Sequence, residues 1–261
     1  MKRHVVLGAA ALCSILAAST DASAAGDANG LGQKGELIVS GDRLFSLFNF
    51  TSFSVTTSQN GNSVTRTQSG SSMALLWGQE ETELGGGGRL TDPHTVPRLA
   101  IDFTVIDRLT IGGSIVLAFG LGGSTETKAG NTTASVDSPT TTVFGIAPRV
   151  GYIIPVGEIL AIWPRGGFSF YSQSTKSKET QNNNTTTTSV SGSQFSLDLD
   201  PVLAIVPIPH FFFTVGPLIN IPLTGTFKTT VENGANTVER SDDLSIFHLG
   251  IAAGVGGWFN L

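Results

Sequence analysis

The chain has 261 residues, a formal net charge of -5, 13% charged residues and 40% hydrophobic residues. This acidic balance excludes nucleic acid as a partner, and soluble domains usually carry about a quarter charged residues. The low charge and the 32 glycines favour a membrane β-barrel, in which one strand face meets lipid and the other packs a narrow lumen with small residues.

The first 25 residues are typical of a secretory signal peptide. A basic start, residues 1–4, precedes an apolar run from Val5 to Ala18, and small residues then allow cleavage after Ala24 or Ala25. Because Cys13 is the only cysteine and lies in this leader, no disulfide or cysteine metal site is expected in the mature chain. The predicted organisation is a signal peptide at 1–25, a periplasmic segment at 26–43 and an outer-membrane β-barrel at 44–261.

The first predicted strand runs from Leu44 to Thr57, with phenylalanines ready to face lipid and a face change near Asn49 that indicates a bulge. The segment Val64 to Trp77 is also strand-like. We interpret it as an extracellular ribbon that extends the first hairpin, with two additional wall strands as the alternative. Gly78 to Thr95 is glycine-rich and is predicted to be a flexible loop.

From Arg98 onward, apolar residues alternate with small or polar ones, as expected for strands with one face in lipid. The alternating segments are 98–105, 109–121, 144–152, 160–170, 195–205, 211–221 and 247–261. These seven crossings and the first strand predict an all-β, up-and-down antiparallel transmembrane barrel of eight strands, with ten as the alternative.

Short turns alternate with long polar stretches along this part of the chain. The polar stretches are Gly123 to Thr140, Ser172 to Ser193 and Val231 to Asp243. Short periplasmic turns and long extracellular loops are typical of outer-membrane barrels, so these stretches are expected to be loops outside the cell. Prolines 148, 164, 201 and 217 lie inside predicted strands and are expected to mark bulges or weakly paired rungs.

The final strand has the clearest alternation, with odd-numbered apolar residues from Phe247 to Leu261 predicted to face lipid. Together with the signal peptide and the hairpins, its ending Gly-Gly-Trp-Phe-Asn-Leu resembles the eight-stranded outer-membrane β-barrel superfamily, like the membrane domain of the major outer-membrane protein A. The resemblance covers roughly 44–261 and implies the outer membrane of a Gram-negative cell. It also implies that the barrel assembly machinery reads the last strand, although here the final aromatic residue, Phe259, is two positions before the end.

Two sets of residues are candidate sites. Five charged residues fall on the predicted inward face at similar depth and are expected to form a charge network in the lumen: Asp102, Arg149, Arg165, Asp198 and Asp200. The network requires Arg165 to hydrogen-bond Asp198 or Asp200, because isolated charges at this depth are too costly. A second, weaker candidate is a rim site of His248 with Asp242 and Asp243.

The favoured function is a structural, adhesion or other surface-exposed role for a barrel with a side-chain-filled lumen, and not an enzyme. The alternative is a narrow, porin-like channel or a transporter for small or hydrophobic solutes. A third hypothesis is an enzyme that modifies lipid A or peptides. The expected partners are outer-membrane lipid, lipopolysaccharide and the assembly machinery, with no cofactor or metal.

Overall fold

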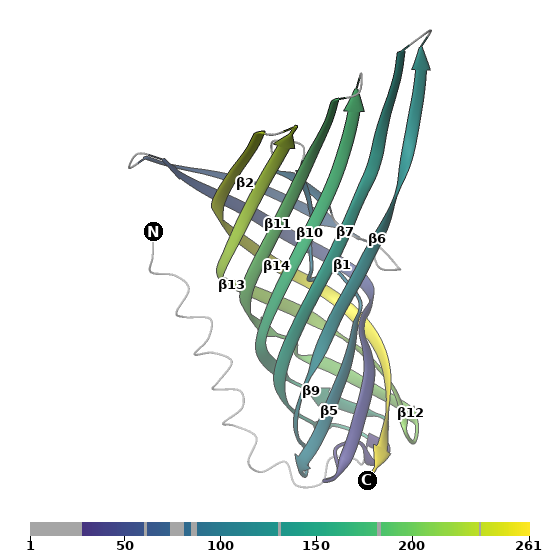
Figure 1. Ribbon diagram of the computed structural model, residues 1–261. Coiled ribbons are helices and arrows are strands. Elements are labelled where there is room, and N and C mark those ends of the chain that lie inside the picture. Colours follow the sequence, from purple (N-terminus) through teal and green to yellow (C-terminus); the bar gives the residue numbers. More distant parts are fainter. Residues whose placement is uncertain are drawn as a thin grey trace.

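The computed structural model describes residues 28–59, 62–73, 81–84, 88–129, 132–181, 184–234 and 236–261 (Figure 1). The expected signal peptide lies outside these residues. One short 3-10 helix, η1 (Ala28–Gly30), precedes the strands. The strands are β1 (Glu36–Gln59), β2 (Asn62–Ser72), β3 (Glu81–Leu84), β4 (Gly88–Thr91), β5 (Arg98–Ile106), β6 (Leu109–Ala129), β7 (Thr132–Tyr152), β8 (Ile154–Pro155), β9 (Leu160–Trp163), β10 (Arg165–Gln181), β11 (Asn184–Leu199), β12 (Val202–Ile208), β13 (Phe211–Asn233) and β14 (Asn236–Asn260). No helix in the described part of the chain has the length and hydropathy to cross a membrane.

The strands close into an antiparallel ring of eight, as predicted. The ring order is β1, β5, β6, β7, β10, β11, β13 and β14, which returns to β1. β9 and β12 pair with each other and continue the wall beneath β10 and β11. We call the end with the short turns, such as residues 107–108, the turn end and the opposite end the hairpin end.

The alternative of ten wall strands is wrong. β2 and β5 both pair with the same edge of β1, β2 with residues 49–59 and β5 with residues 37–42. β2 is therefore a ribbon on the hairpin-end half of β1, as predicted for the described part of this segment. Residues 74–77 of the predicted ribbon lie outside the described residues.

The first strand begins earlier than expected, at Glu36 instead of Leu44. Its register with β14 shifts between Gly41 and Phe45 and again between Ser46 and Phe48, which confirms an irregularity close to Asn49. Arg43, inside the first shift, has a positive φ of 56°. Because the inserted residues interrupt the alternation of faces, period-two reading missed the first part of the strand.

The four prolines lie at interruptions in the strand pairing. Pro217 lies where the partner of β13 changes from β12, paired with Val215, to β11, paired with Ile219. Pro164 separates β9 from β10, and Pro201 lies between β11 and β12. The pairing of β7 with β10 stops at Arg149 and resumes at Ile146, which skips Pro148. A proline cannot donate a ladder hydrogen bond, so these weakly paired rungs agree with the prediction.

The three polar stretches expected to be loops are mostly paired strands. β6 and β7 stay in register to Ala129 and Thr132, β10 and β11 to Gln181 and Asn184, and β13 and β14 to Asn233 and Asn236. The expectation of long loops was wrong because threonine and valine favour extended backbone and several of these strands also find partners on neighbouring hairpins. β11, for example, pairs with both β10 and β13 over its polar part. Asn182 and Asn183 lie outside the described residues.

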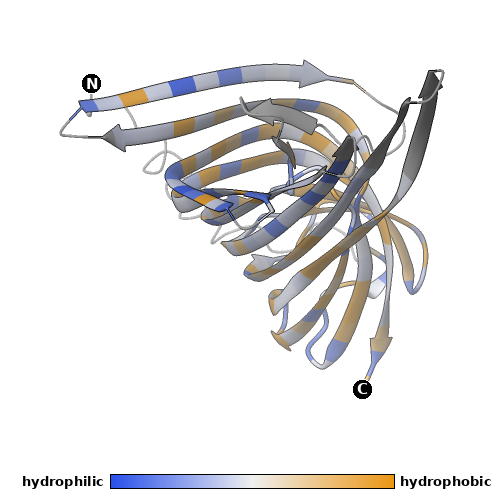
Figure 2. Cartoon of the chain, turned by 45° about the horizontal axis from the view of Figure 1, so that its top comes forward, coloured by the Kyte–Doolittle hydropathy of each residue, from blue (hydrophilic) through white to orange (hydrophobic). Residues whose placement is uncertain are grey.

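The strands are hydrophobic toward the turn end (Figure 2), and exposed residues on the outward face of the ring there are apolar. Ile251 is 42% exposed whereas the next residue, Ala252, is 5% exposed, so the final strand has the predicted orientation. Exposed apolar side chains of this band include Leu99, Ile101, Ile111, Ile115, Phe144, Ile146, Phe168, Phe170, Phe213 and Leu249. This fold is a closed antiparallel β-barrel of eight strands with an outward apolar band, an arrangement typical of β-barrels that span membranes.

The inside of the ring is layered. Near the turn end, η1 and inward residues form an apolar layer, the lower cluster: Ala28, Leu31, Ile38, Ile153, Ala161, Trp163, Val202, Ala204, Val206, Phe212 and Trp258. Nearer the hairpin end lies the upper cluster: Phe53, Val55, Leu90, Val190, Phe227, Leu244 and Ile246. Along β1, Ile38 of the lower cluster and Phe53 of the upper cluster are separated by buried polar residues, including Asp42 and Thr51.

The end of β4 and the residues that follow it enter the ring. Residues 90–96, which we call the lumen segment, are all buried, although the sequence predicted a flexible loop ending at Thr95. Leu90 packs in the upper cluster, and Val96 packs with Val116, Val143 and Tyr171 from three wall strands. Polar contacts with the barrel wall hold this segment in place. The glycine-rich sequence before it gives no indication of these contacts.

Candidate functional site

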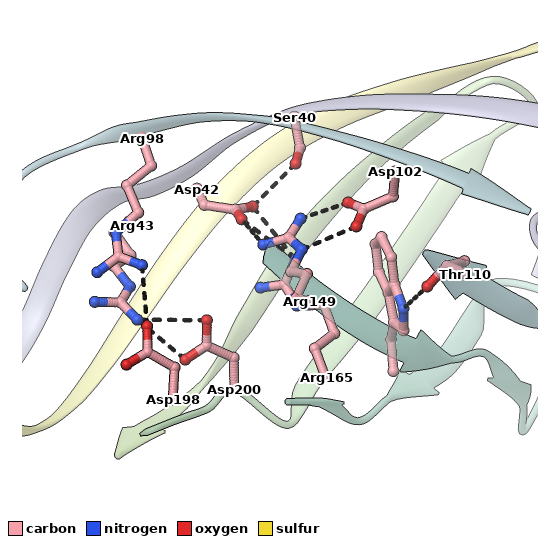
Figure 3. A network of polar contacts seen from close by, with 11 residues as sticks. Ser40, Asp42, Arg43, Arg98, Asp102, Thr110, Arg149, Arg165, Asp198 and Asp200 are labelled. Atoms are coloured by element: carbon pink, nitrogen blue, oxygen red, sulfur yellow. Dashed lines mark hydrogen bonds and ion pairs between the residues drawn. The ribbon is translucent and has the colours of Figure 1, made fainter. Parts of the chain in front are cut away.

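The predicted lumen charges are all buried inside the ring, where Arg149 is the centre of a first group (Figure 3). Nε of Arg149, on β7, donates to the carboxylate of Asp102, on β5, at 2.9 Å. Nη1 of Arg149 also donates to the carboxylate of Asp42, on β1. Nη1 of Arg165 lies 3.4 Å from the same Asp42 carboxylate, so one aspartate serves two arginines. Charge-assisted bonds of this kind are the strong class of hydrogen bond.

A second group surrounds Asp198 and Asp200 (Figure 3). Nη2 of Arg43 lies 3.1 Å from Asp200, and Nη1 of Arg98 lies 3.6 Å from Asp198. Ser169 donates to Asp198 at 2.9 Å. Together the two groups contain four arginines and four aspartates, so the buried charges balance. Paired burial avoids the large cost of an isolated ion in a dry interior.

The predicted partner of Arg165 was wrong. Its guanidinium contacts Asp42, and only its main chain bonds Asp200, with N to O distances of 3.2 and 2.8 Å. The guanidinium also lies over the Trp163 ring, 4.9 Å from the centroid, a favourable cation-π position. The inference that Arg165 and Asp200 lie close together was correct, but the side chain of Arg165 turns toward the opposite wall of the ring.

Sequence reasoning missed three members of the network, Asp42, Arg43 and Arg98. Asp42 and Arg43 lie at the β1 irregularity, where both adjacent residues turn inward and alternation fails. The available signal was two adjacent charges in an otherwise apolar segment. Arg98 alternates in phase with Asp102, so its inward direction was readable from the same pattern that identified Asp102.

A histidine cluster lies between the charge network and the upper cluster. Nδ1 of His248, on β14, lies 2.9 Å from Oδ2 of Asp92, in the lumen segment, and the Thr51 hydroxyl donates to the same oxygen at 2.5 Å. His94 lies beside them, with ring centroids 5.6 Å from His248 and 5.0 Å from Tyr171. The lumen segment is thereby tied to two wall strands by one carboxylate.

The predicted rim site is not assembled. His248 is fully buried and pairs with Asp92, whereas Asp242 accepts a hydrogen bond from Arg240 at 2.8 Å and Asp243 is exposed. Asp242 and Asp243 lie five to six residues along β14 from His248, toward the hairpin end, which is about 17 to 20 Å at about 3.3 Å per residue. The expectation failed because the true partner of His248 comes from the lumen segment, far away in sequence.

The cluster holds several buried polar atoms without a hydrogen-bond partner among the described residues: both ring nitrogens of His94, Nε2 of His248, the Tyr171 hydroxyl and the Asn49 amide. An aspartate and a histidine in contact can move a proton, but this pair is enclosed by protein. Burial of His94, together with the charges of Arg98 and Arg43, holds its pKa well below the usual value despite Asp92 nearby. Among the described residues, no three histidine, cysteine or acidic side chains are placed to hold a metal ion.

Comparisons with known proteins give only distant structural similarities. No protein-family model matches the sequence, and no curated protein matches it. Ail, the attachment invasion locus protein of Yersinia pestis, is similar in structure with a TM-score of 0.34 and 11% identity, over 87% of this chain and all of that one. The outer membrane protease OmpT from Escherichia coli is similar with a TM-score of 0.38 and 8% identity, over 86% of this chain and 97% of that one.

Proposed function

We propose that this chain is an outer-membrane protein with a closed barrel that anchors its polar hairpins at the cell surface, where they carry a structural or adhesive function. The observation that carries the proposal is the filling of the lumen. An apolar cluster lies on each side of a balanced charge network, and the lumen segment occupies the space between the walls.

The filled lumen argues against the channel alternative. A conducting path requires residues 90–96 to leave the barrel, which breaks the contact of His248 with Asp92 and the bond from Arg43 to the His94 carbonyl at 2.9 Å. It also requires water to pass Trp163, Phe212 and Trp258 in the lower cluster, all 2% exposed or less. Eight-stranded barrels are in general just wide enough for side chains to fill.

The hairpins are the accessible part of the molecule. β6 with β7, β10 with β11, and β13 with β14 form long hairpins that project at the hairpin end (Figure 1). Their polar side chains include the exposed ion pair of Lys228 with Glu239, 2.6 Å apart. Exposed segments on a rigid scaffold are where proteins commonly place binding functions.

The same proposal assigns the partners of the barrel wall. The apolar band contacts outer-membrane lipid, and lipopolysaccharide surrounds its upper edge, near the base of the hairpins. The assembly machinery recognises β14, whose Phe259 is 61% exposed on the outward face. β14 also closes the ring against β1.

Shortening one hairpin tests the function without opening the barrel. Residues 177–188 are replaced by Asn-Gly, which keeps the paired residues Lys176 and Ser189. We expect wild-type cells to adhere to surfaces or to one another, the shortened variant to lose most of that adhesion, and both proteins to show no sustained current in planar bilayers. Sustained open currents from the wild type, or unchanged adhesion after shortening all three hairpins, overturn the proposal.

A further inference from the structure

The outer edge of β2 is a long strand edge that has no partner among the described residues. No described strand pairs with it, and residues 62–71 are all exposed. The register with β1 is continuous over eleven residue pairs without a bulge. Natural edges are usually protected by proline, charged residues or bulges, whereas β2 has no proline and no bulge and carries a single charged residue, Arg66. The hairpin of β1 and β2 also projects sideways, away from the other hairpins (Figures 1 and 2).

One face of this hairpin is a ladder of hydroxyl groups. Ser69 bonds Ser52 at 3.1 Å, Thr67 bonds Ser54 at 3.0 Å, Thr65 bonds Thr56 at 2.8 Å and Ser63 bonds Ser58 at 2.9 Å. Every odd-numbered residue of β2 from Ser63 to Ser71 is serine or threonine. A strand with hydroxyls at alternate positions can therefore extend the ladder, and the chain itself contains such a strand.

The hydrogen-bonding groups of the free edge follow from the register. Gln59 and Asn62 pair across two residues, which makes them the closing hydrogen-bonded pair of a hairpin. Hydrogen-bonded pairs then recur at every second residue, so the main chain of even-numbered β2 residues bonds β1. The N–H and C=O groups of Ser63, Thr65, Thr67 and Ser69 therefore point to the free edge.

We propose that β2 is a homotypic interface, in which β2 of a second copy of this chain adds antiparallel to it about a two-fold axis at Thr67. Centring on Thr67 pairs all eleven residues of β2. It places serine or threonine opposite serine or threonine at each odd position, and it places Arg66 opposite Gln68. Centring one residue earlier sets Arg66 against Arg66, which is unfavourable.

This pairing is compatible with a location in a membrane. The membrane location itself rests on the proposed function. Two copies in one membrane are related by an axis along the membrane normal, which reverses directions in the membrane plane. Because the hairpin projects sideways from the barrel (Figure 1), the sideways directions of β2 in the two copies are opposed, as an antiparallel pair requires. Strand addition at an exposed edge is an established mode of recognition that relies on main-chain hydrogen bonds.

Cysteine cross-linking tests the register in the full mature chain, purified in detergent from a Cys13→Ser background. Thr67→Cys is expected to form a disulfide dimer under mild oxidation, because residues at the two-fold axis face each other about 5.5 Å apart between Cα atoms. Ser63→Cys is the matched control, since the two Ser63 positions lie about 26 Å apart at 3.3 Å per residue. Chains with Ser63→Cys mixed with chains with Ser71→Cys are expected to cross-link.

Proline substitution provides a second measurement by sedimentation. Thr67→Pro removes the edge donor and should weaken the dimer at least about tenfold, whereas Thr67→Val keeps the N–H and should keep dimerisation. Heat-modified mobility on gels confirms that each variant is folded. Equal cross-linking at positions 63 and 67, or a monomer at all concentrations, overturns the interface. These measurements use purified protein in detergent, whereas the proposed function is tested by adhesion and conductance. A failure of the dimer interface is therefore distinguishable from a failure of the proposed function.

Discussion

The carboxylate of Asp92 lies 2.9 Å from Nδ1 of His248, although the two residues are 156 positions apart. Asp92 belongs to the lumen segment and His248 to the last wall strand, so this contact ties the segment to the wall that closes the ring. Both side chains are fully buried, and breaking such a contact leaves a polar group unpaired in the interior.

Asp92→Ala should therefore release the lumen segment. The substitution removes the acceptor of the Thr51 hydroxyl and of the His94 main-chain N–H, and it leaves Thr51 and His248 only their mutual contact at 3.2 Å. The expected cost is on the order of 2 to 3 kcal/mol. Thr95→Cys, at a position that is 1% exposed, reports the release through labelling by a water-soluble maleimide. We expect slow labelling in the otherwise wild-type protein and fast labelling with Asp92→Ala. Asp243→Ala is the control, and equally slow labelling in all three proteins contradicts the anchoring role.

Asp42→Asn should destabilise the barrel, because Arg149 and Arg165 share this carboxylate. Removal of one partner from a buried ion pair typically costs about 3 to 5 kcal/mol. Urea unfolding in detergent micelles measures the free energy. The exposed Asp243→Asn should change it by less than about 0.5 kcal/mol. Similar stabilities of the two variants show that the network contributes little.

Ile251→Arg should impair membrane insertion, because this side chain is 42% exposed in the apolar band. Arginine on the lipid face near the midplane costs about 2 to 4 kcal/mol. Val238→Arg lies on the same strand above the band and is 67% exposed, so it should assemble normally. Folding into lipid vesicles, followed by gel mobility, compares the two. Normal insertion of Ile251→Arg means that the lipid face is assigned incorrectly.

Gly167→Ala should disturb the wall between β7 and β10. A Cβ atom at Gly167 would lie 2.1 Å from the Pro148 carbonyl oxygen, whereas one at Gly157 would have no neighbour within 4 Å. Forced overpacking typically costs about 1 to 3 kcal/mol. Thermal unfolding of the two alanine variants should show a clear loss for Gly167→Ala and almost none for Gly157→Ala. A loss in both, or in neither, is the contrary result.

The orientation can be tested in intact cells. Lys178→Cys lies on the exposed part of β10, and Glu158→Cys lies in an exposed turn at the opposite end. If the hairpins face the medium, an impermeant thiol reagent labels the cysteine at 178 in intact cells and the cysteine at 158 only after permeabilisation. The inverse pattern places the hairpins in the periplasm.

Local alternation of apolar and polar residues by itself determines much of this fold. Ile251 and Ala252, or Ile101 and Asp102, point to opposite faces because successive residues of a strand always do, so lipid-facing and inward residues could be assigned from spacing alone. Counting the turns predicted eight wall strands, and the inward positions of Arg149 and Arg165 followed from the same rule.

Tertiary structure decided which inward residues meet. Arg165 contacts Asp42 rather than its neighbour Asp200, and His248 contacts Asp92 rather than the nearby Asp242. These choices depend on the irregularity at Arg43, on closure of the ring between β1 and β14, and on entry of residues 90–96 into the lumen. Alternation specifies the face of each strand, but contacts across a barrel depend on strand register and ring closure, which bring together residues far apart in the chain.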